Sequence, residues 1–197
     1  MVAAGVTRLG LKLWSAPVWT TTVSFPWSIE MHFIARDEAD FLEKKLRRQI
    51  DEQARPKIVL YYQSGKRDYC DSANAIAASI GAFTEASLHF TFCVTGDGWN
   101  EGEATNERWS RYRKWRAANG ENRRLHDAPW HQFEPHETGQ LSKAIEFALL
   151  LGWDALVSAR PGRQLLALSH DDRIEIYRGF NGRLLAEKLM TLGYWHR

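Results

Sequence analysis

Apolar and polar residues alternate most clearly near the start of the chain. From Val23 to Phe33 a large apolar residue stands at every second position, and residues 9–13 alternate in the same way. A period of two places these apolar side chains on one face of an extended strand. The other face is then polar, which favours an antiparallel sheet with one wetted side. Pro26 cannot donate a ladder hydrogen bond, so it is expected at a sheet edge or a break.

A different period begins at Asp37. Leucine or isoleucine recurs at every fourth position over 42–50, and opposite charges such as Glu43 and Arg47 stand four residues apart. Both features predict a helix with one buried side, which begins at Asp37 and ends before Pro56.

The same criteria predict further strands and helices along the chain. The expected strands cover 57–62, 87–94, 154–159, 163–169 and 173–178, and the expected helices cover 71–83, 107–118, 138–151 and 182–195. Asp71 or Ser72 is expected to begin the helix over 71–83. Gly152 is expected to end the helix over 138–151, and Asn181 is expected to cap the helix over 182–195.

Two stretches, 95–106 and 121–137, show neither period and are expected to be loops. The elements together predict an α+β fold, a single compact domain with a mixed, mainly antiparallel sheet of about seven strands and about five helices. The domain is expected to cover residues 1–197, and a seam, if there is one, to fall in the loop region 119–137.

The composition is that of an ordinary globular protein. Hydrophobic residues make up 44% of the chain and charged residues 25%, which excludes a disordered or fibrous protein. The 26 Lys and Arg residues and the 24 Asp and Glu residues leave a formal net charge of +2. This near balance argues against a surface built everywhere to hold nucleic acid, but it allows a local basic patch.

The cysteines and the apolar segments predict a cytoplasmic protein with no membrane contact. Cys70 and Cys93 are too few for a disulfide framework, and their apolar neighbours predict buried free thiols in a reducing compartment. The N-terminus lacks the pattern of a signal peptide. The most apolar segment, 144–153, is about half as long as a membrane span requires.

The stretch from Ser169 to Asp172 has the residue types of a catalytic triad. A triad needs a spatial chain of hydrogen bonds from serine to imidazole to carboxylate, whereas Ser169, His170 and Asp171 are consecutive. Neighbouring side chains on a strand point to opposite faces, and the glycine-flanked turn that exposes a nucleophilic serine is missing. The stretch is therefore expected to be a hairpin turn.

Three histidines at intervals of five residues, His126, His131 and His136, stand among carboxylates and suggest a metal site. Their spacing matches neither a helical H-E-x-x-H site nor a paired-cysteine ribbon, so a polar loop without metal is preferred. Gly65-Lys66 lacks the earlier glycine of a phosphate-binding loop. We therefore expect no metal and no cofactor.

The segment that most strongly suggests a binding function is basic and aromatic, and it covers residues 108–124. Between 107 and 124, seven Arg and Lys residues stand against two Glu residues, and three aromatic residues recur at every third position. In a helix these aromatic residues share one side. The candidate partner-binding residues are Arg108, Trp109, Arg111, Tyr112, Arg113, Trp115 and Arg116.

This segment allows three interpretations. Its aromatic side could pack on the sheet while the arginines face water. Alternatively, the arginines could grip phosphates while a ring stacks on a base, or Trp and Arg could anchor an acidic partner protein. The acidic residues that precede it, Asp97, Glu101 and Glu103, could instead neutralise the helix within the molecule.

The favoured hypothesis is a non-catalytic protein-binding factor, immunity- or antitoxin-like, that covers the surface of a partner protein. The alternative is a nucleic-acid-binding protein or RNA-acting enzyme that uses residues 108–124. A hydrolase built on the loop histidines and nearby carboxylates is a third hypothesis. The sequence leaves catalysis and the oligomeric state open, because many enzymes show no motif in a single sequence.

Overall fold

The structure is a computed structural model, and it describes seven stretches of the chain: residues 31–53, 55–62, 68–81, 90–95, 107–159, 164–178 and 181–196. The strands expected before residue 31 lie outside the described residues, except for the end of the alternating segment. Gly65-Lys66 and the acidic residues of the loop over 96–106 also lie outside them.

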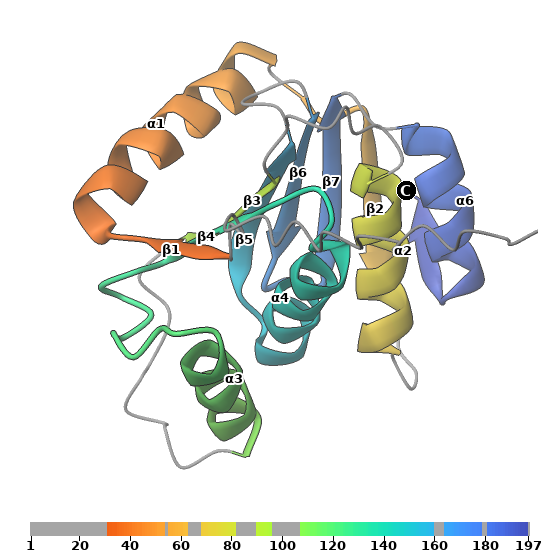
Figure 1. Ribbon diagram of the computed structural model, residues 1–197. Coiled ribbons are helices and arrows are strands. Elements are labelled where there is room, and N and C mark those ends of the chain that lie inside the picture. Colours follow the sequence, from red (N-terminus) through yellow and green to blue (C-terminus); the bar gives the residue numbers. More distant parts are fainter. Residues whose placement is uncertain are drawn as a thin grey trace, which may run out of the picture.

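Within the described residues, eight strands form one sheet through the middle of the molecule (Figure 1). In sheet order they are β1 (His32–Ile34), β4 (Trp130–Phe133), β3 (Phe90–Thr95), β5 (Asp154–Ala159), β6 (Gln164–Ser169), β7 (Arg173–Arg178), β2 (Ile58–Tyr62) and β8 (Tyr194–His196). Each described strand pairs with its neighbours in antiparallel orientation. The expected α+β fold is therefore confirmed, with one strand more than predicted.

Helices cover both faces of this sheet. Those in the described residues are α1 (Arg36–Gln53), α2 (Tyr69–Gly81), α3 (Glu107–Ala118), α4 (Thr138–Leu151) and α6 (Gly182–Thr191). Helices α2, α4 and α6 cover one face, and α1 covers the other (Figure 1). Helix α3 lies beside α4, toward the end of the sheet where β1 and β4 pair.

The alternation of side chains along the strands divides the core between the two faces. In β5, Ala155 and Val157 belong to the larger apolar cluster with α2, α4 and α6, while Leu156 belongs to the cluster under α1. Ala39 and Leu46 of α1 close that second cluster. The central strands are thus buried on both faces, and the prediction of a sheet wetted on one side is wrong for them.

Several predictions of element boundaries are confirmed. Helix α3 covers 107–118 and is followed by Gly120, whose φ of 81° is in the left-handed region. Helix α4 covers 138–151 and ends at Gly152, which also has a left-handed backbone. The Asn181 side chain caps α6 by accepting a hydrogen bond from the Leu184 amide.

The stretch 121–137 contains a strand that its sequence did not reveal. Residues 130–133 form β4, which pairs with β1 on one side and β3 on the other. A four-residue strand that includes His131 and Gln132 is too short to show a period of two clearly. Its backbone groups are satisfied by the neighbouring strands, so only the assembled sheet defines it.

The end of the chain also departs from prediction. The closing helix, expected over 182–195, ends at Thr191, and Tyr194–His196 form β8 at the edge of the sheet beside β2. Gly193 adopts a φ of 95°, which a residue with a side chain rarely accepts. This left-handed residue lets the chain leave the helix and return to β2.

Helix α2 begins earlier than expected. Its first residue is Tyr69, and the Asp68 carboxylate accepts a hydrogen bond from the Asp71 amide at 2.8 Å, so Asp68 is the capping residue. Cys70 lies on the outer side of the first turn and is exposed, which corrects the prediction of a buried thiol. Cys93 in β3 is buried as predicted, and burial raises the pKa of its thiol.

No helix in the described stretches has the length and apolar character needed to cross a membrane. The extent of the domain over residues 1–197 stays a prediction. The region 119–137, named as a potential seam, contributes β4 to the interior of the common sheet.

The Asp68→Ala variant tests the observed start of α2. Loss of the capping carboxylate should lower the free energy of unfolding by about 1 kcal/mol in urea denaturation. Asp68→Asn is the matched control, because asparagine caps about as well as aspartate. If Asp71→Ala destabilised the protein more than Asp68→Ala, the cap would be at Asp71.

Candidate binding site around α3

The aromatic side of α3 faces the core. Trp109 is 7% exposed and Tyr112 1% exposed. The Tyr112 ring packs edge-on against Phe147 of α4 and Trp153, at centroid distances of 5.3 and 4.9 Å. These contacts fix the position of α3 on the protein, as the packing interpretation predicts.

Trp115 is half-buried and connects α3 to two neighbouring elements. Its indole N–H donates to Gln140 Oε1 of α4 at 2.8 Å, and its ring stacks on His131 of β4 at 5.8 Å between centroids. Phe33 of β1 packs against both rings. Much of the surface of Trp115 is therefore in contact with other residues of the protein.

The charged residues of α3 other than Arg116 are exposed. Arg108, Arg111, Arg113 and Lys114 are exposed. Arg108 donates to the Leu150 carbonyl at 3.2 Å, and Arg111 forms an ion pair with Glu146 at 3.7 Å. Of the seven candidate residues, three arginines thus face solvent, whereas Trp109, Tyr112 and Arg116 are buried.

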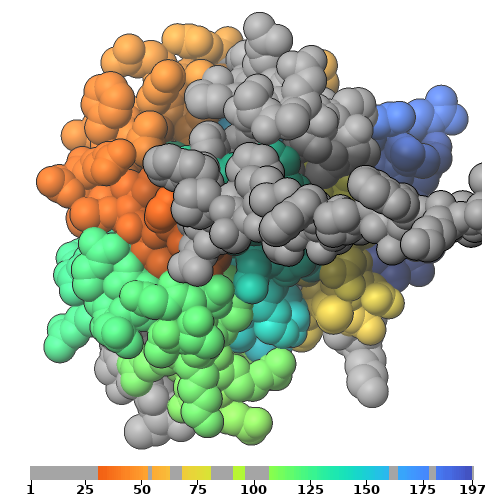
Figure 2. Space-filling model, viewed as in Figure 1, coloured from red at the N-terminus to blue at the C-terminus, as the bar shows by residue number. Residues whose placement is uncertain are grey.

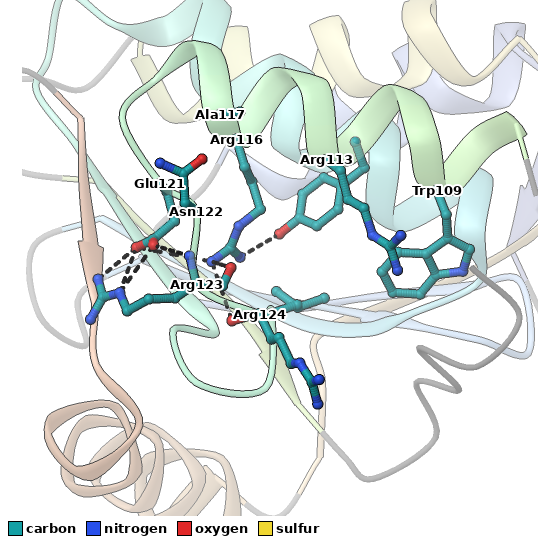
Figure 3. Close-up of a pocket in the computed structure, with 10 residues that line it drawn as sticks. Trp109, Arg113, Arg116, Ala117, Glu121, Asn122, Arg123 and Arg124 are labelled. Atoms are coloured by element: carbon teal, nitrogen blue, oxygen red, sulfur yellow. Dashed lines mark hydrogen bonds and ion pairs between the residues drawn. The ribbon is translucent and has the colours of Figure 1, made fainter. Parts of the chain in front are cut away.

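A hollow of about 620 Å³ lies between α3 and the segment that follows it (Figure 3). We call it the α3 hollow; its lining residues are Trp109, Tyr112, Arg113, Arg116, Ala117, Glu121, Asn122, Arg123, Arg124 and Leu125. Figure 2 shows α3 and the following segment (green) together on one side of the molecule. The left-handed Gly120 lets the chain turn back after α3, so that residues 121–125 form the second wall.

Arg116 lies beneath the α3 hollow and is 2% exposed. Its Nη1 donates to the Tyr112 hydroxyl at 2.9 Å and to the Ala128 carbonyl at 3.1 Å. Its Nη2 donates to the carbonyls of Arg123 and Arg124 at 3.2 and 3.4 Å. One buried guanidinium therefore holds the returning segment against α3, as the dashed lines in Figure 3 indicate.

Tyr112 extends this network to His131 in β4. The Tyr112 hydroxyl lies 3.1 Å from His131 Nε2. The hydroxyl accepts from Arg116, and it donates its own proton to Nε2 in the tautomer that carries the imidazole proton on Nδ1. Burial and the positive charge of Arg116 both hold the pKa of His131 well below its ordinary value, so the imidazole is neutral.

Glu121 is the acidic residue of the lining and is bound by Arg123. Its carboxylate accepts from the Arg123 amide at 2.7 Å and from Arg123 Nε at 3.0 Å, and it lies 4.0 Å from Arg116 Nη2. Burial alone would raise the pKa of Glu121, but the hydrogen bonds from Arg123 and the charge of Arg116 outweigh it and lower the pKa. Glu121 is therefore an anion whose charge is already used by its two neighbours.

The three loop histidines do not converge. His131 is buried in the sheet, while His126 and His136 are exposed. Within the described stretches no group of three or more His, Cys, Asp or Glu residues is placed to hold a metal ion.

The stretch at Ser169 forms the hairpin turn that was expected. Residues 170–172 connect β6 to β7, and Asp172 takes a left-handed φ of 57°. The exposed His170 ring bonds Asp154 through Nδ1 at 2.9 Å, which together with Asp171 raises its pKa. The Ser169 hydroxyl accepts from the Asp171 amide at 3.3 Å instead of pairing with the imidazole.

No protein-family model, curated protein or solved structure matches this chain.

Five lining residues of the α3 hollow, from 121 to 125, were not among the candidate residues. Arg123 and Arg124 stood in the basic segment, but the end of the helix at Asn119-Gly120 gave no reason to bring them back against α3. The two arginines three and four residues after Gly120 were the available indication.

The Tyr112→Phe variant tests the network beneath the α3 hollow. Without the hydroxyl, Arg116 loses one acceptor and His131 Nε2 loses its hydrogen-bond partner, so the free energy of unfolding should fall by about 1–3 kcal/mol. Tyr61→Phe is the matched control, because its hydroxyl has no hydrogen-bond partner in the described part of the chain. Equal effects of the two substitutions would contradict the network.

The neutral state of His131 predicts a loss of stability in mild acid. The pKa of a free histidine is about 6.5. Since the folded pKa is lower, the unfolded chain binds the proton first as the pH falls below that value. His131 should therefore lower the free energy of unfolding by up to about 1.4 kcal/mol per pH unit between the two pKa values.

The His131→Phe variant should remove this contribution. Urea denaturation between about pH 7.5 and about pH 5.5 should show that the free energy of unfolding falls less steeply with pH in the variant than in the wild type. The difference should approach the slope that corresponds to the uptake of about one proton on unfolding. Equal slopes would indicate that His131 is not held neutral in the folded protein.

Proposed function

We propose that this protein is a non-catalytic binding factor that docks an acidic surface of a partner protein onto the outer side of α3. In an immunity- or antitoxin-like mode, it would act by covering the partner's surface. The observation that carries this proposal is the division of α3 into a buried aromatic side and an exposed basic side.

The packing of α3 supports this proposal because it fixes the basic side in place. Trp109 and Tyr112 anchor the helix in the core, so Arg108 and Arg111 project from a rigid element. Helix α3 then loses less conformational freedom on binding than a mobile basic segment would. Arginine is also enriched among residues that contribute most to protein interfaces.

The same packing weighs against the nucleic-acid alternative. Binding of a single strand combines phosphate contacts with aromatic rings on which bases stack. Trp109 and Tyr112 are buried, and Trp115 is engaged with Gln140 and His131. The exposed arginines of α3 remain available for contacts with phosphates, whereas the rings of Trp109, Tyr112 and Trp115 are largely covered by other residues of the protein.

The partner can be identified by crosslinking from α3 and then measured. A photo-crosslinking amino acid in place of the exposed Ala118 keeps every arginine, and the same amino acid in place of Thr191 on α6 is the control. We expect one protein to crosslink from α3 and not from α6. Crosslinks from α3 to RNA alone would support the nucleic-acid alternative instead.

Charge reversal then tests the role of α3 in that complex. With the purified partner, Arg111→Glu should raise the Kd by about tenfold or more, because an attractive contact becomes repulsive. Lys188→Glu on α6 makes the same change of charge on another exposed helix and should leave the Kd unchanged. Equal effects of both variants would show that only the overall charge matters.

A further inference from the structure

We infer that the α3 hollow is a binding site for a small molecule that carries a phosphate monoester. This inference concerns the recess between α3 and residues 121–125, and it goes beyond the proposed partner surface on the outer side of α3. It rests on the charge, the donors and the size of the recess.

The lining of the α3 hollow has an excess of positive charge. Among the described residues of the lining, four arginines stand against a single carboxylate, that of Glu121; the arginines are Arg113, Arg116, Arg123 and Arg124. Figure 3 places Glu121 with Arg123 at one end, while Arg113 descends from α3 at the other. The excess positive charge therefore lies toward Arg113, in a recess where an anion is less screened than on an open surface.

Arg113 provides donors for such an anion. Within the described residues it forms no hydrogen bond or ion pair, and its side chain lines the hollow from α3. Arg124 and Asn122 line the hollow from the returning segment. Guanidinium groups bind phosphate oxygens through two parallel N–H groups, so arginines from separate elements can hold a single phosphate group.

The charge of the ligand follows from this excess. A carboxylate carries a single negative charge, whereas a phosphate monoester carries about −1.5 to −2 near pH 7 and offers three oxygen acceptors. Four arginines against one carboxylate among the described lining residues favour the more highly charged group. A phosphodiester of nucleic acid has one charge per residue and gains less from this recess.

The remaining lining leaves room for an organic body. Trp109, Tyr112, Ala117 and Leu125 contribute apolar surface beside the arginines. A volume of about 620 Å³ falls within the roughly 300–1,000 Å³ of typical small-molecule sites. The recess therefore fits a phosphorylated small molecule better than a lone carboxylate side chain.

Arg116 gives this site a defined shape before a ligand arrives. Through the carbonyls of Arg123 and Arg124 it holds the backbone of the second wall. A wall that is already ordered loses less entropy when a ligand binds. Arg116 therefore acts as a positioning residue for the second wall.

Calorimetric titration of the full chain at low ionic strength tests this site with adenosine monophosphate, inorganic phosphate and adenosine. We expect adenosine monophosphate to bind and adenosine to show no heat of binding. Binding of inorganic phosphate as well would support the site and identify the phosphate as sufficient. Failure of both phosphates to bind, or equal binding of adenosine, would overturn the inference.

Substitution of two exposed arginines of the lining, compared with that of a nearby lysine outside it, tests where the ligand binds. Arg113→Gln and Arg124→Gln should each weaken binding of adenosine monophosphate by about tenfold or more, as expected for loss of a charge-assisted hydrogen bond. Lys114→Gln removes the same charge beside Arg113 but outside the lining, and should change affinity by less than about twofold. Equal losses in all three variants would contradict a defined site.

A short single-stranded RNA separates this site from a nucleic-acid surface. If the RNA bound much more tightly than adenosine monophosphate, and Lys114→Gln weakened it as much as Arg113→Gln, a nucleic-acid surface would replace the monoester site. Crosslinking of a protein partner from α3 does not depend on any of these titrations, so the partner proposal can fail or succeed separately.

Discussion

The site depends on one buried charge, the guanidinium of Arg116. A charge removed from water must be compensated by hydrogen bonds, because an uncompensated one would cost several kcal/mol. Its acceptors come from Tyr112 and from three carbonyls of residues 123–128, with the Glu121 carboxylate close by. Helix α3, the returning segment and β4 are therefore held as one unit, and the α3 hollow is the space that this unit encloses.

This unit divides the basic aromatic segment between two kinds of chemistry. The aromatic rings of Trp109 and Tyr112 are used for packing, so the arginines supply what remains for recognition. Those on the outer side of α3 present charge to a large surface, whereas Arg113 and the arginines of the returning segment surround a recess. The two proposals follow from this division, since an exposed basic side of a helix suits a macromolecule and a basic recess suits a small anion.

Helices and strands long enough to repeat their hydrophobic pattern several times were predictable from the sequence, and the shortest strands were not. Helices α3 and α4 span three or more turns, strands β5 and β6 carry apolar runs, and β7 alternates between charged and apolar residues. Local pattern and glycine positions were therefore sufficient to locate them. Strands β4 and β8 are too short to show a period, and they exist because neighbouring strands satisfy their backbone. Asp68 caps α2 ahead of Asp71, which the presence of several aspartates concealed.

The sequence by itself determined the fold class, the hairpin turn at residues 170–172 and the basic aromatic character of α3, because each depends on residues close together in the chain. The tertiary structure decided which side chains of α3 are buried and how residues 121–125 return to form a second wall. It also placed His131, alone among the three loop histidines, in a buried strand where it is hydrogen-bonded to Tyr112. These features depend on contacts between β1, β4, α3 and α4, and no local pattern specifies which of those elements meet.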